Sequence, residues 1–262
     1  YSLCIISLIC ACSPNPYISS NRLYKKQSKN YAALLKEYPV KDSFVTNPSF
    51  VGTSNFSMRK PNFVVLHHTA QNSCEETLKT FTTVRTQVSS HYVICRTGII
   101  FHMLHDLFRA HHAGASRWGG STDINSNSIG IEIDNNGSEP YSEVQINSLL
   151  EVLKHLKATY KIPAHHFIGH ADIAPGRKVD PSRLFPWKKL AEGGFGIWFD
   201  TTQVQTPVNF NPMLALRIIG YDISNPKAAI QSYKIHFVPD DTTSVINDHD
   251  RKILYSLMQQ SL

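Results

Sequence analysis

The sequence lacks several features that would point to particular classes of protein. Its basic residues are not interleaved with aromatic residues in the manner of many nucleic-acid-binding proteins, so we expect no nucleic-acid partner. Tandem repeats are absent as well. The most apolar charge-free stretch, residues 1–12, is too short to cross a membrane.

Cysteine is also scarce. Of the five cysteines, three lie in residues 1–12, which leaves Cys74 and Cys95 in the body of the chain. A disulfide between these two would require an exported protein, because cytosolic thiols are kept reduced. The sequence leaves open whether they pair or remain two buried thiols.

Charge is distributed unevenly along the chain. Hydrophobic residues make up 42% of the 262 residues, enough for one sizeable domain and something small beside it. Residues 13–60 hold eight Lys and Arg but two acidic residues, and so account for the whole formal charge of +6. A basic segment of this kind favours anionic surfaces.

The first twelve residues, YSLCIISLICAC, are typical of the apolar region of a signal peptide. Their end resembles the cleavage box of bacterial lipoproteins, with Cys12 as the lipidated first residue of the mature chain. We therefore expect an exported protein held to a membrane by its acyl anchor. Ser13, by analogy with the enteric sorting rule, favours the outer membrane, facing the periplasm. An ordinary cleaved signal and a short buried segment are the alternatives.

Strand and helix patterns alternate between residues 60 and 200, which predicts an α/β fold with a mixed central sheet and flanking helices. Strands are expected within 62–69, 91–103, 128–134 and 165–170, and Thr97-Gly98 joins two of them. Residues 129–134 alternate, so three isoleucines face one way and Glu132 the other. Helices are expected after the capping boxes at Ser73, with apolar positions as far as Val88, and at Ser142.

Four segments are expected along the chain. They are a signal remnant ending in the lipoprotein box at 1–12, a basic tether at 13–59 with a short helical turn near its middle, an α/β domain at 60–200 and a small helical module at 201–262. The last begins with a linker rich in Thr, Gln, Pro and Asn at 201–212. Three apolar-periodic pieces follow it, around 213–219, 228–236 and 248–258.

Three polar residues have the chemistry of a metal site. His170 and Asp180 lie ten residues apart with the Pro175-Gly176 turn between them, and His67 follows a buried strand. Imidazole nitrogen and carboxylate oxygen are zinc ligands, and a catalytic site keeps one position open. The chain has 13 histidines, however, so the residues alone leave this set as one candidate. The alternative pair, His166 and His170, would need a helix that the neighbouring Pro and Gly oppose.

Several motifs resemble one family when taken together and in order. They are VVLHHTA, SSHYVICRTGIIFHM, RAHHAGASRW, NSIGIEIDNNG, YKIPAHHFIGHADIAPGRKVDP and FPWKKLAEGGFGIW. They resemble the zinc N-acetylmuramoyl-L-alanine amidases of the AmiD and AmpD type, a family that includes phage amidases and animal peptidoglycan recognition proteins. The resemblance covers residues 60 to 200. The lipoprotein-like start and the helical end make the membrane-anchored AmiD-like branch the most similar.

The resemblance implies a role for individual residues. One zinc ion per chain would be held by His67, His170 and Asp180, while Glu132 and Lys178 would act in catalysis. A carboxylate can move the proton, and an ammonium group can stabilise the negative oxygen of the intermediate. His91 and His112 match family positions near the substrate cleft. They would bind substrate or support the site, and a purely structural role is the alternative. The chain departs from the family's pattern at two positions, His68 and His111.

The implied reaction is hydrolysis of the amide between N-acetylmuramic acid and the L-alanine of the stem peptide, with peptidoglycan or a muropeptide as the partner of a monomer. The 201–262 segment resembles a peptidoglycan-binding-like module, and a helical cap is the alternative. Competing functions are a non-catalytic peptidoglycan-recognition module, a cytosolic recycling amidase and a zinc hydrolase for a related amide.

Overall fold

The computed structural model describes residues 15–36, 53, 55, 57–58 and 60–262. They belong to two compact units, Tyr1–Phe56 and Ser57–Leu262, and each is described by itself. The predicted signal remnant, with Cys12, lies outside the described residues. In the part of the chain that is described, no helix is long and apolar enough to cross a membrane.

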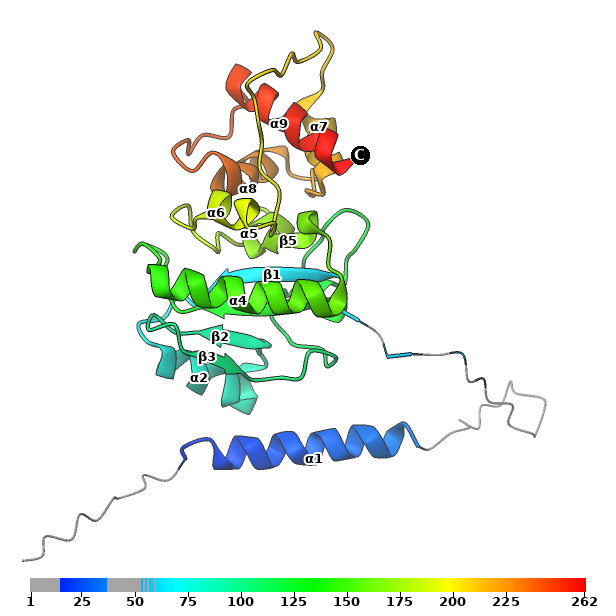
Figure 1. Cartoon of the computed structure of the whole chain (residues 1–262), viewed down its shortest axis with the longest axis vertical. Coiled ribbons are helices and arrows are strands. Elements are labelled where there is room, and N and C mark those ends of the chain that lie inside the picture. Colours follow the sequence, from blue (N-terminus) through cyan, green and yellow to red (C-terminus); the bar gives the residue numbers. More distant parts are fainter. Residues whose placement is uncertain (1–14, 37–52, 54, 56, 59) are drawn as a thin grey trace, which may run out of the picture. The chain divides into compact units, whose positions relative to one another are not determined.

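The first unit contains a longer helix than the sequence suggested. Helix α1 spans Ile18–Leu34, where a tether with a short helical turn was expected (Figure 1). The segment has no glycine, proline or acidic residue, and Lys, Arg, Gln, Ala and Leu are good helix formers. Its basic residues recur at helical spacing, so they share one face: Arg22, Lys25, Lys26 and Lys29.

The second unit is built on a five-stranded sheet with strand order β3-β2-β4-β1-β5. The strands are β1 Phe63–His68, β2 Tyr92–Ile94, β3 Ile100–His102, β4 Ser128–Ile133 and β5 Phe167–Gly169. All neighbours are parallel except β2 and β3, which form the expected hairpin. Gly98, at φ +82°, adopts the left-handed backbone that this tight connection requires. The predicted mixed sheet is confirmed.

Each face of the sheet is covered by a different set of helices. Leu66 and the three isoleucines of β4 pack against α4, Glu143–Tyr160, which runs along the sheet in Figure 1. On the other face, Val65 and Ile168 share one core with the C-terminal helices. These are α7 Pro212–Ile219, α8 Pro226–Phe237 and α9 Asp248–Ser261, close to the predicted positions.

Short elements link these layers. They are η1 Val84–Thr86, α3 Ile124–Asn127, η2 Ala164–His166, α5 His170–Ile173 and α6 Trp187–Glu192. Helix α2, Cys74–Thr82, is shorter than its apolar spacing predicted, and Val84 is 72% exposed. The β-branched run Thr82-Thr83-Val84 disfavours continuing the helix.

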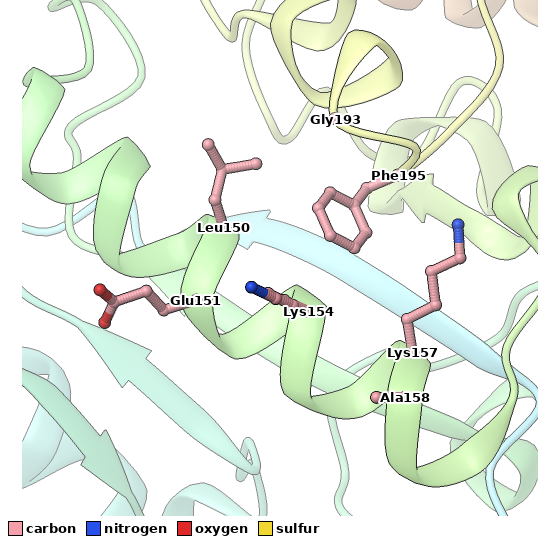
Figure 2. Close-up of a pocket in the computed structure, with 7 residues that line it drawn as sticks. All are labelled: Leu150, Glu151, Lys154, Lys157, Ala158, Gly193 and Phe195. Carbon is pink, nitrogen blue, oxygen red and sulfur yellow. The ribbon is translucent and has the colours of Figure 1, made fainter.

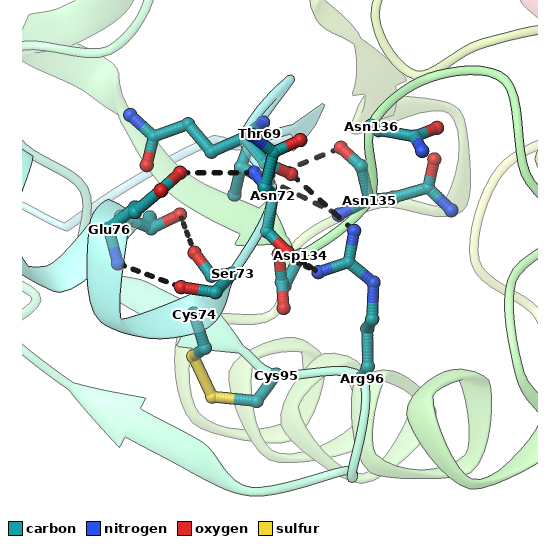
Figure 3. A network of polar contacts seen from close by, with 12 residues as sticks. Thr69, Asn72, Ser73, Cys74, Glu76, Cys95, Arg96, Asp134, Asn135 and Asn136 are labelled. Carbon is teal, nitrogen blue, oxygen red and sulfur yellow. Dashed lines mark hydrogen bonds and ion pairs between the residues drawn. A yellow bond between two sulfur atoms is a disulfide. The ribbon is translucent and has the colours of Figure 1, made fainter.

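Both predicted helix starts use their serine cap, but their partner side chains act elsewhere. Ser73 accepts from Glu76 N, while the Glu76 carboxylate accepts from Asn72 N (Figure 3). Ser142 likewise accepts from Gln145 N. The Gln145 amide donates to two strand-end carbonyl oxygens instead of to the cap. The third residue of each helix thus hydrogen-bonds the backbone of a neighbouring segment: the loop before α2 in one case, and the ends of β2 and β4 in the other.

Cys74 and Cys95 form a disulfide, which joins the start of α2 to the end of β2 (Figure 3). Beside it, the Arg96 guanidinium donates to Asp134 Oδ1 at 2.8 Å and to Asn72 O at 3.0 Å. Arg96 thereby connects the segments that follow β1, β2 and β4. These contacts fix the loops at the carboxyl end of the parallel strands, the end at which α/β folds bind ligands.

Candidate active site

Three side chains from separate segments converge at the carboxyl end of the parallel strands. His67 is near the end of β1, His170 begins α5 directly after β5, and Asp180 ends the following loop. His67 Nδ1 lies 2.9 Å from His170 Nδ1, and each lies 3.0 Å from Asp180 Oδ2. Across the described ranges, this is the one group of His, Cys, Asp or Glu whose ligand atoms could hold a metal ion.

The fold explains this convergence. Strands β1 and β5 are parallel neighbours, so the residues that follow them meet at the same end of the sheet. The chain then reverses at Gly176, which has φ +75°. Ala171 N donates to Asp180 O at 2.7 Å and closes the loop, so that the carboxylate returns to the two imidazoles.

The outer contact of His170 identifies its protonated nitrogen. His170 Nε2 lies 3.1 Å from Ala113 O, and a carbonyl oxygen can accept but not donate. Nε2 therefore carries the proton in the neutral ring, and Nδ1 presents a lone pair to the cluster. Arg177 donates to the same carbonyl at 2.8 Å and to Ala115 O at 2.6 Å, which holds this loop in place.

A chain of three groups does the same for His67. Ser128 Oγ donates to Ile124 O at 2.6 Å, so its oxygen accepts from His112 Nε2 at 3.1 Å. His112 Nδ1 then accepts from His67 Nε2, also at 3.1 Å. The Nδ1 of His67 is left with a lone pair that faces His170 and Asp180. An outer partner that sets the tautomer of a ligand is the usual arrangement around metal sites.

The charges of the three residues agree with this assignment. Burial lowers the pKa of His67 to about 4, and His170 adds to the effect while Asp180 opposes it. Burial by itself would raise the pKa of Asp180, but the two adjacent imidazole rings hold it well below its usual value. His67 therefore presents a neutral imidazole and Asp180 a carboxylate, which are the metal-binding forms of these side chains.

The residues present fit zinc. Three lone-pair atoms at 2.9 and 3.0 Å repel one another unless a cation lies between them. Tetrahedral zinc with bonds of about 2.0–2.2 Å would hold its ligand atoms roughly 3.3–3.6 Å apart, so small side-chain shifts would admit the ion. Two histidines and one carboxylate leave one tetrahedral position for water or substrate, as in catalytic zinc sites.

Glu132 and Lys178 lie beside this cluster. Glu132 pairs in register with His67 across the parallel strands β4 and β1, so both side chains leave the same face of the sheet. Burial raises the pKa of Glu132 to about 8, with Asp180 adding and Lys178 opposing. A carboxyl group that titrates near neutral pH can both accept and release a proton. Lys178 is half-buried on the loop that runs from α5 to Asp180.

The other predicted histidines lie in different surroundings. His112 contacts His67, as described, and is buried. His91 is fully buried, and its ring nitrogens bond Phe108 O and the backbone N–H of Gly130, which is the environment of a structural residue. His68 points away from His67 and accepts from Ser182 N at 3.1 Å. His166 bonds Asn62 O, outside the three-residue group.

A cavity lies over the loop that runs from α5 to Asp180. Its volume of about 650 Å³ is within the usual range of small-molecule sites. Lys178 and His68 line it from the part of the chain that forms the sheet and its loops. Residues of α8 line it as well: Gln231, Ser232 and Ile235. The C-terminal helices thus form part of the cleft wall, which sequence reasoning did not anticipate.

A second cavity, of about 530 Å³, lies over α4 (Figure 2). Leu150, Lys154 and Phe195 line it, and Lys157 at its rim donates to Gly194 O at 2.7 Å. It contains no histidine or cysteine, and α4 covers the sheet face opposite to the one from which His67 projects. Of these two cavities, the first is therefore the one that reaches the candidate site, through Lys178.

Sequence reasoning missed the residues that support the candidate metal ligands. Ser128, Arg177 and the Ala113 carbonyl act through contacts that cross from one segment to another. One signal was available: Arg177 stands inside the quoted GHADIAPGRKVDP motif, three residues before Asp180. The backbone carbonyl has no sequence signature.

Comparisons with known proteins agree with this geometry. Residues 57–183 match the family model for N-acetylmuramoyl-L-alanine amidase. The chain is 34% identical over 208 residues to N-acetylmuramoyl-L-alanine amidase AmiD of Escherichia coli, covering 67% of this chain and 74% of that protein. It is 36% identical over 104 residues to the 1,6-anhydro-N-acetylmuramyl-L-alanine amidase AmpD of Haemophilus influenzae, covering 39% of this chain and 56% of that one.

Two solved structures are similar over most of the chain. A complex of E. coli AmiD with anhydro-N-acetylmuramic acid-L-Ala-D-γ-Glu-L-Lys has a TM-score of 0.68 at 28% identity, covering 80% of this chain and 93% of that one. AmpDH3 of Pseudomonas aeruginosa has a TM-score of 0.71 at 28% identity, covering 84% and 98%. With the predicted fold and enzyme class both confirmed, the chain belongs to the N-acetylmuramoyl-L-alanine amidase family.

Proposed function

We propose that this chain cleaves the amide between N-acetylmuramic acid and L-alanine in muropeptides or peptidoglycan, with zinc held by His67, His170 and Asp180. The observation that carries the proposal is the convergence of three lone-pair atoms within 3.0 Å of one another, beside a buried carboxyl group and a cavity. Solved relatives were crystallised with anhydromuramyl peptides, which suggests the substrate class.

The chain's own residues would divide the work of hydrolysis. Zinc bound to the three ligands supplies Lewis acidity toward the scissile carbonyl and lowers the pKa of water. Glu132 accepts the proton of the attacking water and returns it to the nitrogen of the departing L-alanine as the C–N bond breaks. Lys178 lies where its ammonium group can stabilise negative charge on the carbonyl oxygen. Outer hydrogen bonds keep His67 and His170 oriented.

The test is hydrolysis of purified MurNAc-tripeptide by the chain from Ser13 onward. Free muramyl sugar and tripeptide should appear, should vanish when a chelator removes zinc, and should return when zinc is added back. An unchanged rate in the chelator would overturn zinc dependence. Binding to peptidoglycan without any cleavage would favour a recognition module instead.

We also propose that the protein acts in the cell envelope, anchored through a lipid on Cys12. Helix α1 supports this location, because its four basic residues and lack of acidic residues favour a negatively charged surface. Cells expressing the wild type should incorporate labelled palmitate into this protein, and cells expressing Cys12→Ser should not. Equal labelling of the two proteins would rule out Cys12 as the lipidated residue.

A further inference from the structure

A buried polar cluster joins the C-terminal helices to the turn that carries His170. Tyr221 Oη donates to Asp172 Oδ1 at 2.8 Å, and His236 Nδ1 donates to Asp172 Oδ2 at 2.7 Å. The three residues are at most 6% exposed. Tyr221 follows α7 and His236 lies in α8, so both donors come from outside residues 60–200.

Asp172 also closes the turn around the metal ligand. Its Oδ2 accepts from Gly169 N at 2.7 Å, and Gly169 and Asp172 flank His170 in the chain. The approach is close: a Cβ atom on Gly169 would lie 3.2 Å from Asp172 Oδ2 and 3.0 Å from the Trp187 ring. The position of the carboxylate is therefore coupled to the backbone that begins at His170.

The two donors are themselves held in place. The Trp187 ring stacks on His236 with centroids 3.8 Å apart and an angle of 17° between planes. Burial raises the pKa of Tyr221 well above its usual value, so its hydroxyl stays protonated and can donate. Asp172 therefore receives three donors from three segments and has little freedom to move.

We infer that Tyr221 and His236 are positioning residues for the metal centre, holding the His170 turn in its metal-binding geometry through Asp172. This inference rests on the proposed function, because it assigns a role toward the zinc that His170 would bind. It makes the C-terminal segment part of the amidase site, in addition to any contact that its helix α8 makes with substrate. Groups that hydrogen-bond a metal ligand directly typically change metal affinity by about 10–100-fold, and Tyr221 and His236 act one step further out, so we expect the lower end of that range.

The experiment compares Tyr221→Phe and His236→Phe with Tyr233→Phe in the full chain. Both test variants keep an aromatic ring and lose one donor to Asp172. Tyr233 is a matched control, since its buried hydroxyl donates to Asp250 at 3.2 Å in the same helical layer without contacting Asp172. Zinc affinity is measured by competition with a chromophoric chelator, and melting temperature is measured on the metal-free proteins.

We expect zinc affinity to fall about tenfold in the two test variants and to stay at the wild-type value in Tyr233→Phe, while all three melt at somewhat lower temperature. Activity at saturating zinc should largely recover, with KM unchanged. Wild-type affinity in both test variants would overturn the inference, as would an equal loss in all three proteins. Failure of the wild type itself to bind zinc would instead overturn the proposed function.

Discussion

Replacing Asp180 by alanine is expected to abolish both zinc binding and hydrolysis. The variant loses the carboxylate that lies 3.0 Å from both imidazoles, so the remaining pair offers two neutral ligands and no negative charge. Structural and catalytic zinc sites in proteins commonly use at least three protein ligands. Zinc content measured on the dialysed protein, together with cleavage of MurNAc-tripeptide, checks both losses.

Glu132→Gln is the matched variant. It replaces a buried side chain of the same size beside the cluster but keeps all three ligands, so zinc should bind as in the wild type. Its amide cannot take a proton from water, and kcat should fall by about 10²–10⁴-fold, the usual contribution of a general base or acid. Hydrolysis by Asp180→Ala at the wild-type rate would show that Asp180 is not a ligand. Wild-type kcat in Glu132→Gln would assign the proton transfer to another group.

Ending the chain at residue 200 is expected to prevent the second unit from folding. Apolar residues of one sheet face and of the segments beside it share a single core with α7, α8 and α9: Phe63, Val65, Trp118, Ile168 and Ile173. Exposing such side chains costs about 1.5–3 kcal/mol each, so losing even part of their cover approaches the about 5–15 kcal/mol that stabilises a typical domain. Asp172 would also lose Tyr221 and His236 as donors.

The truncated chain should therefore be insoluble or lack a cooperative thermal transition, as measured by circular dichroism. Co-expression with the separate segment 201–262 is the control, and it should restore folding because the contacts do not require an unbroken linker. A residue 57–200 fragment that melts cooperatively and binds zinc as tightly as the full chain would contradict this expectation. The boundary between the predicted 60–200 and 201–262 segments would then be a true domain boundary.

Local sequence was sufficient for most elements of the fold. Alternation in β4 placed three isoleucines on one face and Glu132 on the other, because side chains alternate along any strand. Serine caps marked the starts of α2 and α4, since a cap depends on a residue three positions away. The length of helix α1 was underestimated, because its residues have good helix propensity but weak apolar spacing. Helix α2 was overestimated because Val84 and Val88 only coincidentally continued its spacing.

The candidate site, like the fold, was predicted in part from the sequence and in part revealed by the structure. Motif residues with distinctive chemistry, such as His67, His170 and Asp180, could be proposed from the sequence because their types and order are informative. Spacing could not distinguish His91 from His112. The structure does so, because one ring bonds backbone groups while the other bonds a metal-ligand candidate.

The sequence by itself determined the family, the order of the motifs along the chain and the chemical identity of the groups that meet. The tertiary structure decided what supports them: the tautomers set through Ser128 and Ala113, the pairing of Cys74 with Cys95, and the joining of α8 to the His170 turn through Asp172. The physical reason is the distance along the chain over which each interaction acts. Alternation and capping act within a few residues, whereas these hydrogen bonds join groups that become neighbours once the sheet and its two helical layers have packed.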